Sequence, residues 1–141
     1  MKFSIYRQSG VIPYRFQGAE LQVLLITSRK GKRWIIPKGI VEAEFSPAES
    51  AAKEALEEAG VRGTIAPEPV GSYQYQKWGG TCTVDVFLMK VETSEPTWEE
   101  DFRKREWLPL DKAIARIREK PLRKIMANLP GKLFAKPKNN S

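Results

Sequence analysis

The residues with the clearest chemical potential are three glutamates, Glu54, Glu57 and Glu58, which stand close together just before Gly60. On a helix, residues three and four positions apart share a face, so the carboxylates would lie side by side. Each like-charged pair costs about 0.2–0.5 kcal/mol, and the negative end of the helix dipole adds about 0.3–1 kcal/mol. A magnesium ion would offset that cost, because it prefers carboxylate oxygens and also binds substrate phosphates. The alternative is a solvated acidic face, with Lys53 paired to Glu57.

The same stretch contains signals for the two ends of that helix. Ser46 and Glu49 form a capping-box pattern, Pro47 suits the first helical position, and Gly60 suits the left-handed conformation that ends a helix. We therefore predict a helix over residues 47–59. At about 100° per residue, its apolar residues fall on one face and the three glutamates on the opposite, outward face. The apolar face is predicted to contain Ala48, Ala52, Ala55, Leu56 and Ala59.

A short strand and a loop are expected immediately before this helix. Residues 34–36 are predicted to form a strand that Pro37 ends, so that Pro37, Lys38 and Gly39 form a loop. The loop would bring backbone carbonyls and the Lys38 ammonium group close to the glutamates. Carboxylates for a metal ion and a lysine for phosphate form a plausible site for attack of water on a pyrophosphate.

The segment from Gly39 to Val61 resembles the Nudix box, whose pattern is G-x5-E-x7-R-E-U-x-E-E-x-G-U with U aliphatic. Two positions depart from the pattern, since Phe45 replaces a glutamate and Lys53 replaces an arginine. The flanking stretches RWIIPKGIVE and WEEDFRKREWLPLDKAI are similar to the diphosphoinositol polyphosphate phosphohydrolase and dinucleoside polyphosphate hydrolase branch. The resemblance implies an α/β (α+β) fold, namely a Nudix-type α/β/α sandwich with a mixed central β-sheet.

The resemblance also implies roles for individual residues. The metal ligands for Mg²⁺, with Mn²⁺ as an alternative, would be Glu54, Glu57, Glu58 and the Gly39 carbonyl. The candidate catalytic residues are Glu57, Glu58 and Lys53, and one glutamate could instead orient or deprotonate the attacking water. The candidate ligands for substrate phosphates are Arg29, Lys32, Arg33, Lys38, Arg103 and Arg105, for which a solvated basic surface is the alternative.

The two departures from the pattern bear on activity. Lys53 can contact the glutamates as the family arginine does, but it lacks the bidentate guanidinium fork, so it would hold them more loosely. Phe45 cannot bind a metal ion, so the function of the missing glutamate is either lost or supplied by Glu42 or Glu44. The second hypothesis for the whole chain is therefore a weakened, Nudix-like module that binds phosphorylated ligands.

The overall composition limits the remaining classes. The 141 residues predict a single domain over 1–130 and a basic, mobile tail over 131–141. The chain has one cysteine, Cys82, and no histidine, which excludes an internal disulfide and imidazole catalysis. The net charge of +7 favours an anionic partner, and we expect a small phosphorylated molecule. Nucleic acid ranks last because no reading motif is present, and the oligomeric state is left open.

No hydrophobic signal segment or membrane-spanning run is found in the sequence, so we expect a cytoplasmic protein without membrane contact. The activity expected from the branch is metal-assisted cleavage of a phosphoanhydride in a highly phosphorylated substrate, such as a diphosphoinositol polyphosphate or a dinucleoside polyphosphate. The alternative substrates are ADP-ribose, nucleotide sugars and nucleoside triphosphates. If the branch is right, the basic residues of 29–33 and 103–105 should converge on one mouth of the site.

Period-two patterns and turn residues predict the other elements. Strands are expected over 1–16, 21–27, 70–76, 81–91 and 106–108, with a hairpin turn at 78–80. Near the C-terminus we predict one helix capped by Asp111 and a second that begins at Pro121 and ends at Pro130 and Gly131.

Overall fold

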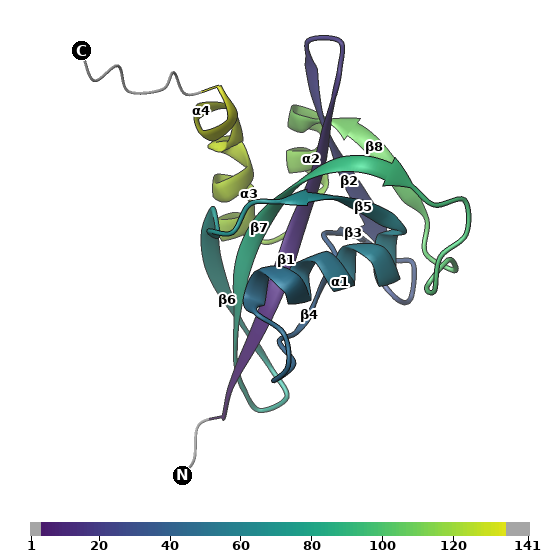
Figure 1. Ribbon diagram of the computed structural model, residues 1–141. Helices are drawn as coiled ribbons and strands as arrows, with labels where there is room; N and C mark the ends of the chain where they lie inside the picture. The colour runs from purple at the N-terminus through teal and green to yellow at the C-terminus, as the bar shows by residue number, and fades with distance from the viewer. Residues whose placement is uncertain (1–3, 135–141) are drawn as a thin grey trace, which may run out of the picture.

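The computed structural model describes residues 4–134, in which one mixed sheet lies between helices (Figure 1). The strands are β1 (Ser4–Gln17), β2 (Glu20–Thr27), β3 (Trp34–Ile35), β4 (Lys38–Ile40), β5 (Val61–Ile65), β6 (Gly71–Lys77), β7 (Gly80–Ser94) and β8 (Arg105–Pro109). The helices are α1 (Pro47–Ala59), α2 (Leu110–Arg116), α3 (Lys120–Ala127) and α4 (Leu129–Leu133). None of these helices in the described range is long and apolar enough to cross a membrane.

The centre of the sheet is a parallel pair formed by β1 and β7, which runs in register from Ser4 opposite Gly80 to Tyr14 opposite Lys90. The main path of the sheet is β3-β2-β1-β7-β5. Strand β4 adds to β1, β6 to β7 and β8 to β2, all antiparallel. One parallel pair among antiparallel pairs makes the sheet mixed, as predicted.

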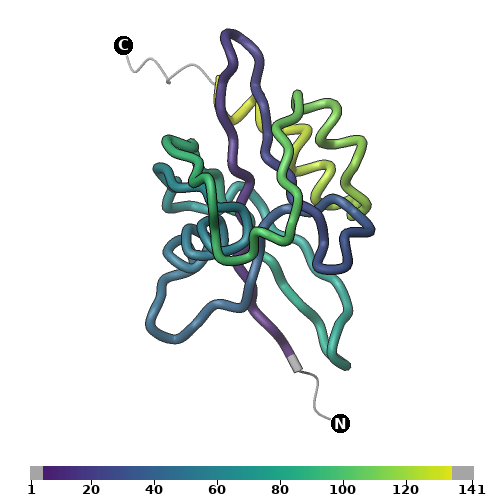
Figure 2. The backbone as a smooth tube through the Cα atoms, turned by 90° about the vertical axis from the view of Figure 1, so that its right-hand side faces the viewer, coloured from purple at the N-terminus to yellow at the C-terminus, as the bar shows by residue number. Residues whose placement is uncertain are grey.

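Two hydrophobic cores fill the spaces on either side of the sheet. On one face, α1 packs its alanines against Val11, Leu24 and Phe87. On the other face, α2, α3 and α4 pack against Ile12, Val86 and their neighbours. The alternation along β7 divides its side chains between the two cores, because successive residues of a strand point to opposite faces. Figure 2 shows α1 on one side of the sheet and the three C-terminal helices on the other. The predicted α/β/α sandwich is confirmed.

Helix α1 begins and ends where its sequence predicts. The Ser46 hydroxyl accepts a hydrogen bond from the Glu49 amide at 3.1 Å, and the Glu49 carboxylate accepts one from the Ser46 amide at 2.9 Å. At the other end Gly60 adopts a left-handed conformation with a φ of 67°. A Ser9 hydroxyl in β1 donates to the Pro47 carbonyl at 2.7 Å and ties the start of the helix to the sheet.

The buried face of α1 differs from the prediction. Ala51, Ala55 and Ala59 are fully buried, whereas Leu56 is only half-buried. The face is therefore rotated toward Glu58, which is buried rather than outward, with 7% of its surface exposed. The close approach of α1 to the sheet explains the rotation, because alanines allow it and a leucine in their place would not.

Several shorter predictions also need correction. Lys38 and Gly39, expected in a loop with Pro37, belong to β4, because β1 supplies an unpaired edge for three residues. Strand β5 was not predicted, since Arg62 and Gly63 interrupt its apolar pattern. Asp111 does not cap α2, which begins at Leu110 after Pro109. Pro130 and Gly131 lie inside α4, and the rest of the expected tail, residues 135–141, lies outside the described residues.

Candidate active site

The Glu54 carboxylate lies against the backbone of Gly39. A Cβ atom added to Gly39 would overlap that carboxylate, so only glycine allows this approach without displacing it. Pairing of β4 with β1 holds Gly39 opposite Ser9 and fixes its position next to α1. The structure therefore brings together the first residue of the Nudix-box pattern and the first of the three glutamates.

The Glu58 carboxyl group is buried next to Glu54. Its Oε1 accepts a hydrogen bond from the Lys38 backbone amide at 3.3 Å, which joins the end of α1 to β4. Burial is the main cause that raises the pKa of Glu58 to about 8; Arg103 opposes the increase, and the neighbouring Glu54 adds to it. Burial also raises the pKa of Glu54, while its hydrogen bond with Glu58 acts in the opposite direction.

Glu57, the third glutamate, is paired with Lys53. The Lys53 ammonium group lies 3.2 Å from Glu57 Oε1 and 2.9 Å from Glu42 Oε1. Both hydrogen bonds raise the pKa of Lys53, and the bond to Glu42 has the larger effect. The contact predicted between Lys53 and a box glutamate is therefore present, and Glu42 shares it. The Phe45 ring is also near Lys53, with 5.8 Å between the ammonium nitrogen and the ring centroid.

Within residues 4–134, no three acidic, histidine or cysteine side chains already converge as a metal cage. The chemistry of the donors nevertheless fits a hard divalent cation. Glu58 is buried and the adjacent Glu54 is half-buried, and the pKa values of both carboxyls are raised. A dication would relieve both the burial cost and their mutual repulsion. Backbone at Gly39 and the third carboxylate of Glu57, on the same turn of α1, could complete an oxygen-rich site.

Glu100 is a candidate site residue that the sequence did not single out. Its negative charge contributes to the raised pKa values of both Glu54 and Glu58, so its carboxylate lies within electrostatic reach of them. Arg103 Nη2 holds it at 2.9 Å and Arg29 Nη2 at 3.4 Å. Glu100 belongs to an acidic stretch and follows Glu58 by 42 positions in the sequence. No helical or strand periodicity relates residues that far apart, so the sequence does not predict their proximity.

Arg103 and Arg105, predicted to bind substrate phosphates, are engaged with the protein itself. Arg103 is 7% exposed and donates to the Thr27 carbonyl at 2.9 Å as well as to Glu100. Arg105 donates to the Ala59 carbonyl at 2.9 Å and to the Glu95 carbonyl at 2.6 Å. These contacts favour a role in positioning the protein's own groups over direct contact with a substrate.

The two basic segments lie near each other, and their convergence on one mouth of the site stays a prediction. The Thr27 amide donates to the Lys104 carbonyl at 2.9 Å, which places the loop after β2 beside the segment before β8. The side chains, however, diverge. Arg29 reaches Glu100, Lys32 is exposed, and Arg33 turns the other way to pair with Glu119 at 2.8 Å.

A pocket opens next to Lys38 on the face of the sheet that α2 and α3 cover. The Lys38 ammonium group donates to the Tyr75 hydroxyl at 3.0 Å and lies 4.7 Å from the centroid of its ring. Tyr75 in turn donates to Gln8 Oε1 at 2.6 Å. Burial, followed by the charge of Lys77, lowers the pKa of Lys38. The residues that line the pocket are Arg33, Ile35, Ile36, Lys38, Tyr73, Tyr75, Arg118 and Glu119.

Lys38 therefore connects the two halves of the site. Its backbone amide donates to the buried Glu58, and its side chain lies in the tyrosine-lined pocket. Lys38 was predicted as a site residue, but its place beside Tyr73 and Tyr75 was not, because Tyr75 follows Lys38 by 37 positions and no local pattern connects the two. The arrangement can hold a cation and an anhydride at one end and a planar group at the other.

A model of the NUDIX domain matches residues 6–129, which include both cores, the glutamate helix and the pocket. The match spans most of the chain, and the protein therefore belongs to the NUDIX family. The fold and the order of the box residues predicted from the sequence agree with this assignment.

Named relatives agree with the family. Nudix hydrolase 21, chloroplastic, of Arabidopsis thaliana is 40% identical over 117 residues, which cover 77% of this chain and 59% of the relative. Diphosphoinositol polyphosphate phosphohydrolase 3-beta of Bos taurus is 30% identical over 111 residues, covering 77% of this chain and 66% of the relative. The chain thus spans about three-fifths of the first relative's length. The cytoplasmic location expected from the sequence stays a prediction, since that relative is named as chloroplastic.

A solved structure extends the comparison of the fold. A C. elegans Ap4A hydrolase in a binary complex superposes with a TM-score of 0.78 at 20% identity, covering 93% of this chain and 99% of the other. At this level of identity, the likeness concerns the shared fold.

Proposed function

We propose that this protein is a metal-dependent hydrolase that cleaves a phosphoanhydride bond in a dinucleoside polyphosphate or a related nucleotide with several phosphates. The observation that carries the proposal is the double contact of Lys38, whose amide meets Glu58 and whose ammonium group lies in the tyrosine-lined pocket. A substrate that spans both ends would place its phosphates between a carboxylate cluster and a lysine, as anhydride hydrolysis requires.

Each group of site residues would have a separate role in the reaction. A divalent cation, Mg²⁺ or Mn²⁺, would be held by Glu54, Glu57, Glu58 and the backbone at Gly39, and would supply charge stabilisation at the phosphate. One of these glutamates, if it does not bind the cation, would instead orient or deprotonate the attacking water. Lys38 neutralises phosphate charge and orients the anhydride toward the glutamates. Lys53 keeps Glu57 in place on α1.

The pocket supports a nucleoside as the non-reacting part of the substrate. Tyr73 and Tyr75 lie with their rings 6.4 Å apart and 29° from parallel, next to Ile35 and Ile36. Such a surface suits a planar base better than a highly charged ring. The exposed Arg118 at the rim would contact an outer phosphate. The C. elegans structure of similar fold is named as an Ap4A hydrolase, which agrees with this choice.

A diphosphoinositol polyphosphate is the second candidate substrate. It is supported by the exposed cations of the loop after β2, Arg29, Lys30 and Lys32, and by the name of the Bos taurus relative. These cations lie beside the segment before β8 rather than in the tyrosine-lined pocket. We therefore rank this substrate below a dinucleotide.

The test is a substrate panel at fixed ionic strength. Dinucleoside polyphosphates, diphosphoinositol polyphosphates, ADP-ribose, nucleotide sugars and nucleoside triphosphates would each be assayed with Mg²⁺ and with Mn²⁺. We expect the highest kcat/KM for a dinucleotide with four or more phosphates, and Tyr75→Ala to raise its KM by about tenfold, since loss of one base contact costs about 1–3 kcal/mol.

Two outcomes would contradict the proposal. A preference for ADP-ribose by an order of magnitude would remove the polyphosphate assignment and leave a Nudix hydrolase of another substrate class. Tight binding of phosphorylated ligands without turnover by either metal would instead favour the binding module, in which Phe45 and Lys53 have cost the site its activity.

A further inference from the structure

The last turn of α1 ends in carbonyl groups that the helix itself cannot satisfy. The final carbonyls of any α-helix lack partners within the helix. The last turn of α1 also contains no basic residue, although a cation there would offset the negative end of the helix dipole. Donors for the carbonyls and a nearby positive charge matter more than usual in α1, because its last turn contains the acidic residues Glu57 and Glu58.

A single segment of the chain, which runs from the end of β7 to Arg105, the first residue of β8, supplies the missing donors. The Glu100 amide donates to the Glu57 carbonyl at 3.0 Å, and the Trp98 indole Nε1 donates to the Glu58 carbonyl at 3.0 Å. The next two carbonyls are bound in the same way, Ala59 by Arg105 at 2.9 Å and Gly60 by the Glu95 amide at 2.7 Å. We call Glu95, Trp98, Glu100 and Arg105 the carbonyl clamp.

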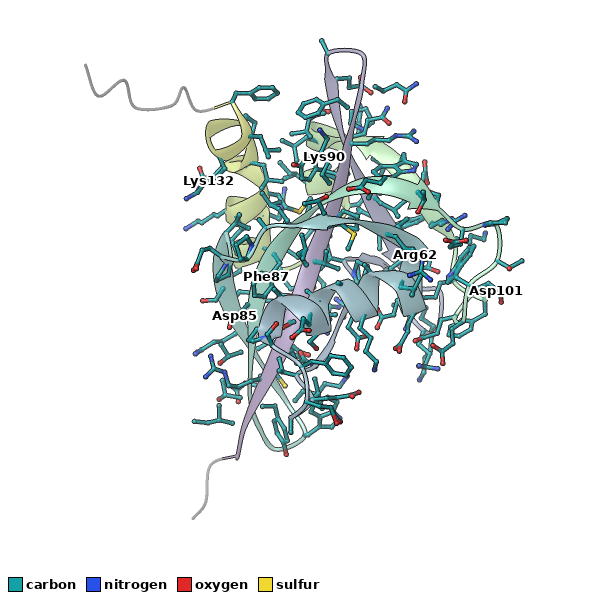
Figure 3. All side chains as sticks on the ribbon, in the orientation of Figure 1. Arg62, Asp85, Phe87, Lys90, Asp101 and Lys132 are labelled. Carbon is teal, nitrogen blue, oxygen red and sulfur yellow. The ribbon has the colours of Figure 1, made fainter. Side chains whose placement is uncertain are left out.

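The parts of the clamp also hold one another. The Arg105 guanidinium lies 4.0 Å from the centroid of the Trp98 ring, and its second nitrogen donates to the Glu95 carbonyl. A Cβ on Gly60 would meet Arg105 Nη1 at 2.7 Å and Trp98 at 2.8 Å, so the clamp can close only over glycine. Figure 1 shows this segment beside the C-terminal end of α1, and Figure 3 labels Arg62 and Asp101 in the same region.

We propose that the carbonyl clamp positions the candidate metal-binding glutamates, with Trp98 and Arg105 as its positioning residues. The clamp binds the peptide carbonyls of Glu57 and Glu58 themselves, so it fixes the backbone from which both carboxylates project. Arg105 also places a positive charge at the helix end where three glutamates gather. The inference rests on the proposed function, because it takes these glutamates to be the metal site.

Two variants test the donors of Trp98 and of Arg105 separately. Trp98→Phe keeps an aromatic ring under Arg105 but removes the indole donor to Glu58. Arg105→Gln removes the charge and the donors to Ala59 and Gly60, and Arg105→Lys returns the charge. The matched control is Arg62→Gln, because Arg62 pairs with the Glu95 carboxylate at 3.3 Å without touching the carbonyls of α1.

The first measurement is Mn²⁺ affinity, obtained from the electron paramagnetic resonance signal of free Mn²⁺. Trp98→Phe and Arg105→Gln should weaken binding by about tenfold, the effect typical of groups that orient metal ligands. They should lower kcat with little change in KM, Arg105→Lys should recover part of the loss, and the control should behave as the parent. Unchanged Mn²⁺ affinity and kcat in both variants would overturn the proposal.

Amide hydrogen exchange in the metal-free protein provides a readout that does not need turnover. The Glu95 and Glu100 amides, which donate to α1, should exchange at least about tenfold faster in Trp98→Phe and Arg105→Gln, as expected when a local opening becomes easier by about 1.4 kcal/mol. Unchanged protection in both variants would show that the clamp does not hold the helix end, whatever the protein hydrolyses. Faster exchange without any Mn²⁺ binding by the parent would instead contradict the proposed function while preserving the clamp. A variant that fails to fold is replaced by Arg105→Lys in both assays.

Discussion

Replacement of Glu58 by glutamine should make the metal-free protein more stable and the enzyme much slower. Burial raises the pKa of Glu58 from 4.5 to about 8, so the ionised carboxylate is unfavourable in the folded state. Glutamine removes that charge. Its amide oxygen can still accept the hydrogen bond from the Lys38 amide, and its nitrogen can donate to Glu54 as a protonated Glu58 would.

The magnitude follows from the pKa difference. Between pH 4.5 and 8 the folded protein binds a proton at Glu58 that the unfolded chain has lost, so the free energy of unfolding falls as pH rises. For one proton, each pH unit changes the free energy of unfolding by about 1.4 kcal/mol. From pH 4.5 to pH 7.5 the loss of stability therefore reaches up to about 4 kcal/mol. Since Glu54 shares this proton, we expect Glu58→Gln to gain about 2–4 kcal/mol at pH 7.5 and nearly nothing at pH 4.5.

The assay is urea unfolding in EDTA at several values between pH 5 and 8. The chain has no histidine, so few other groups titrate in this window. The parent should lose stability across the window, and Glu58→Gln should lose much less. Glu57→Gln is the matched control, because Glu57 is more exposed and pairs with Lys53. With Mg²⁺ and substrate, Glu58→Gln should lower kcat by about 100-fold or more.

Two results would refute this reasoning. If Glu58→Gln were no more stable than the parent at pH 7.5 in EDTA, burial of the charge would not be costly and the site would not need a cation. If the variant kept the parent's kcat with saturating Mg²⁺, Glu58 would have no part in holding the metal.

Three further substitutions test other parts of the chain. Gly39→Ala should weaken Mn²⁺ binding by about tenfold in a titration, because the new Cβ would displace the Glu54 carboxylate; equal affinity would contradict the contact. Phe45→Glu should strengthen Mn²⁺ binding by about fivefold, since one more carboxylate nearby is worth about 1 kcal/mol, and no gain would mean that Glu42 already fills that role. Trp78→Asn should raise the free energy of unfolding in urea by about 1 kcal/mol. Trp78 and Gly79 have φ values of 55° and 68° in a two-residue turn, and such turns favour Asn-Gly. A lower urea midpoint in the variant would argue against backbone strain at Trp78.

Local signals made the glutamate helix predictable. The serine, proline and glycine at the ends of α1 act within one turn of the residues that they cap, so the sequence alone determines both boundaries. The same holds for the hairpin between β6 and β7. Strand β4 was missed because its pairing depends on β1, about 30 residues away, and nothing in Lys38–Ile40 itself favours a strand.

The candidate site was predictable for the same local reason, and only in part. The spacing of Glu54, Glu57 and Glu58 identified them, but not that Glu58 would be buried, because that depends on how closely α1 approaches the sheet. Arg103 and Arg105 were interpreted as phosphate ligands from their charge alone. Besides the nearby Glu100 carboxylate, which Arg103 binds, their partners include the backbone carbonyls of Thr27 and Ala59 on distant elements, and a sequence pattern contains no information about such contacts.

The parallel pairing of β1 with β7 has a consequence for how the chain acquires its structure. The two strands pair over residues 4–14 and 80–90, so the central contact of the sheet joins segments separated by 76 positions, 80 minus 4. Such pairing has a high cost in loop-closure entropy before any contact compensates for it, which slows folding. During synthesis β1 must wait for β7. Strands β2 and β4 and helix α1 precede β7 and can contact β1 in the meantime, but the edge of β1 that pairs with β7 stays open. A truncated chain that ends before β7 would therefore leave a long, exposed strand edge and is expected to aggregate.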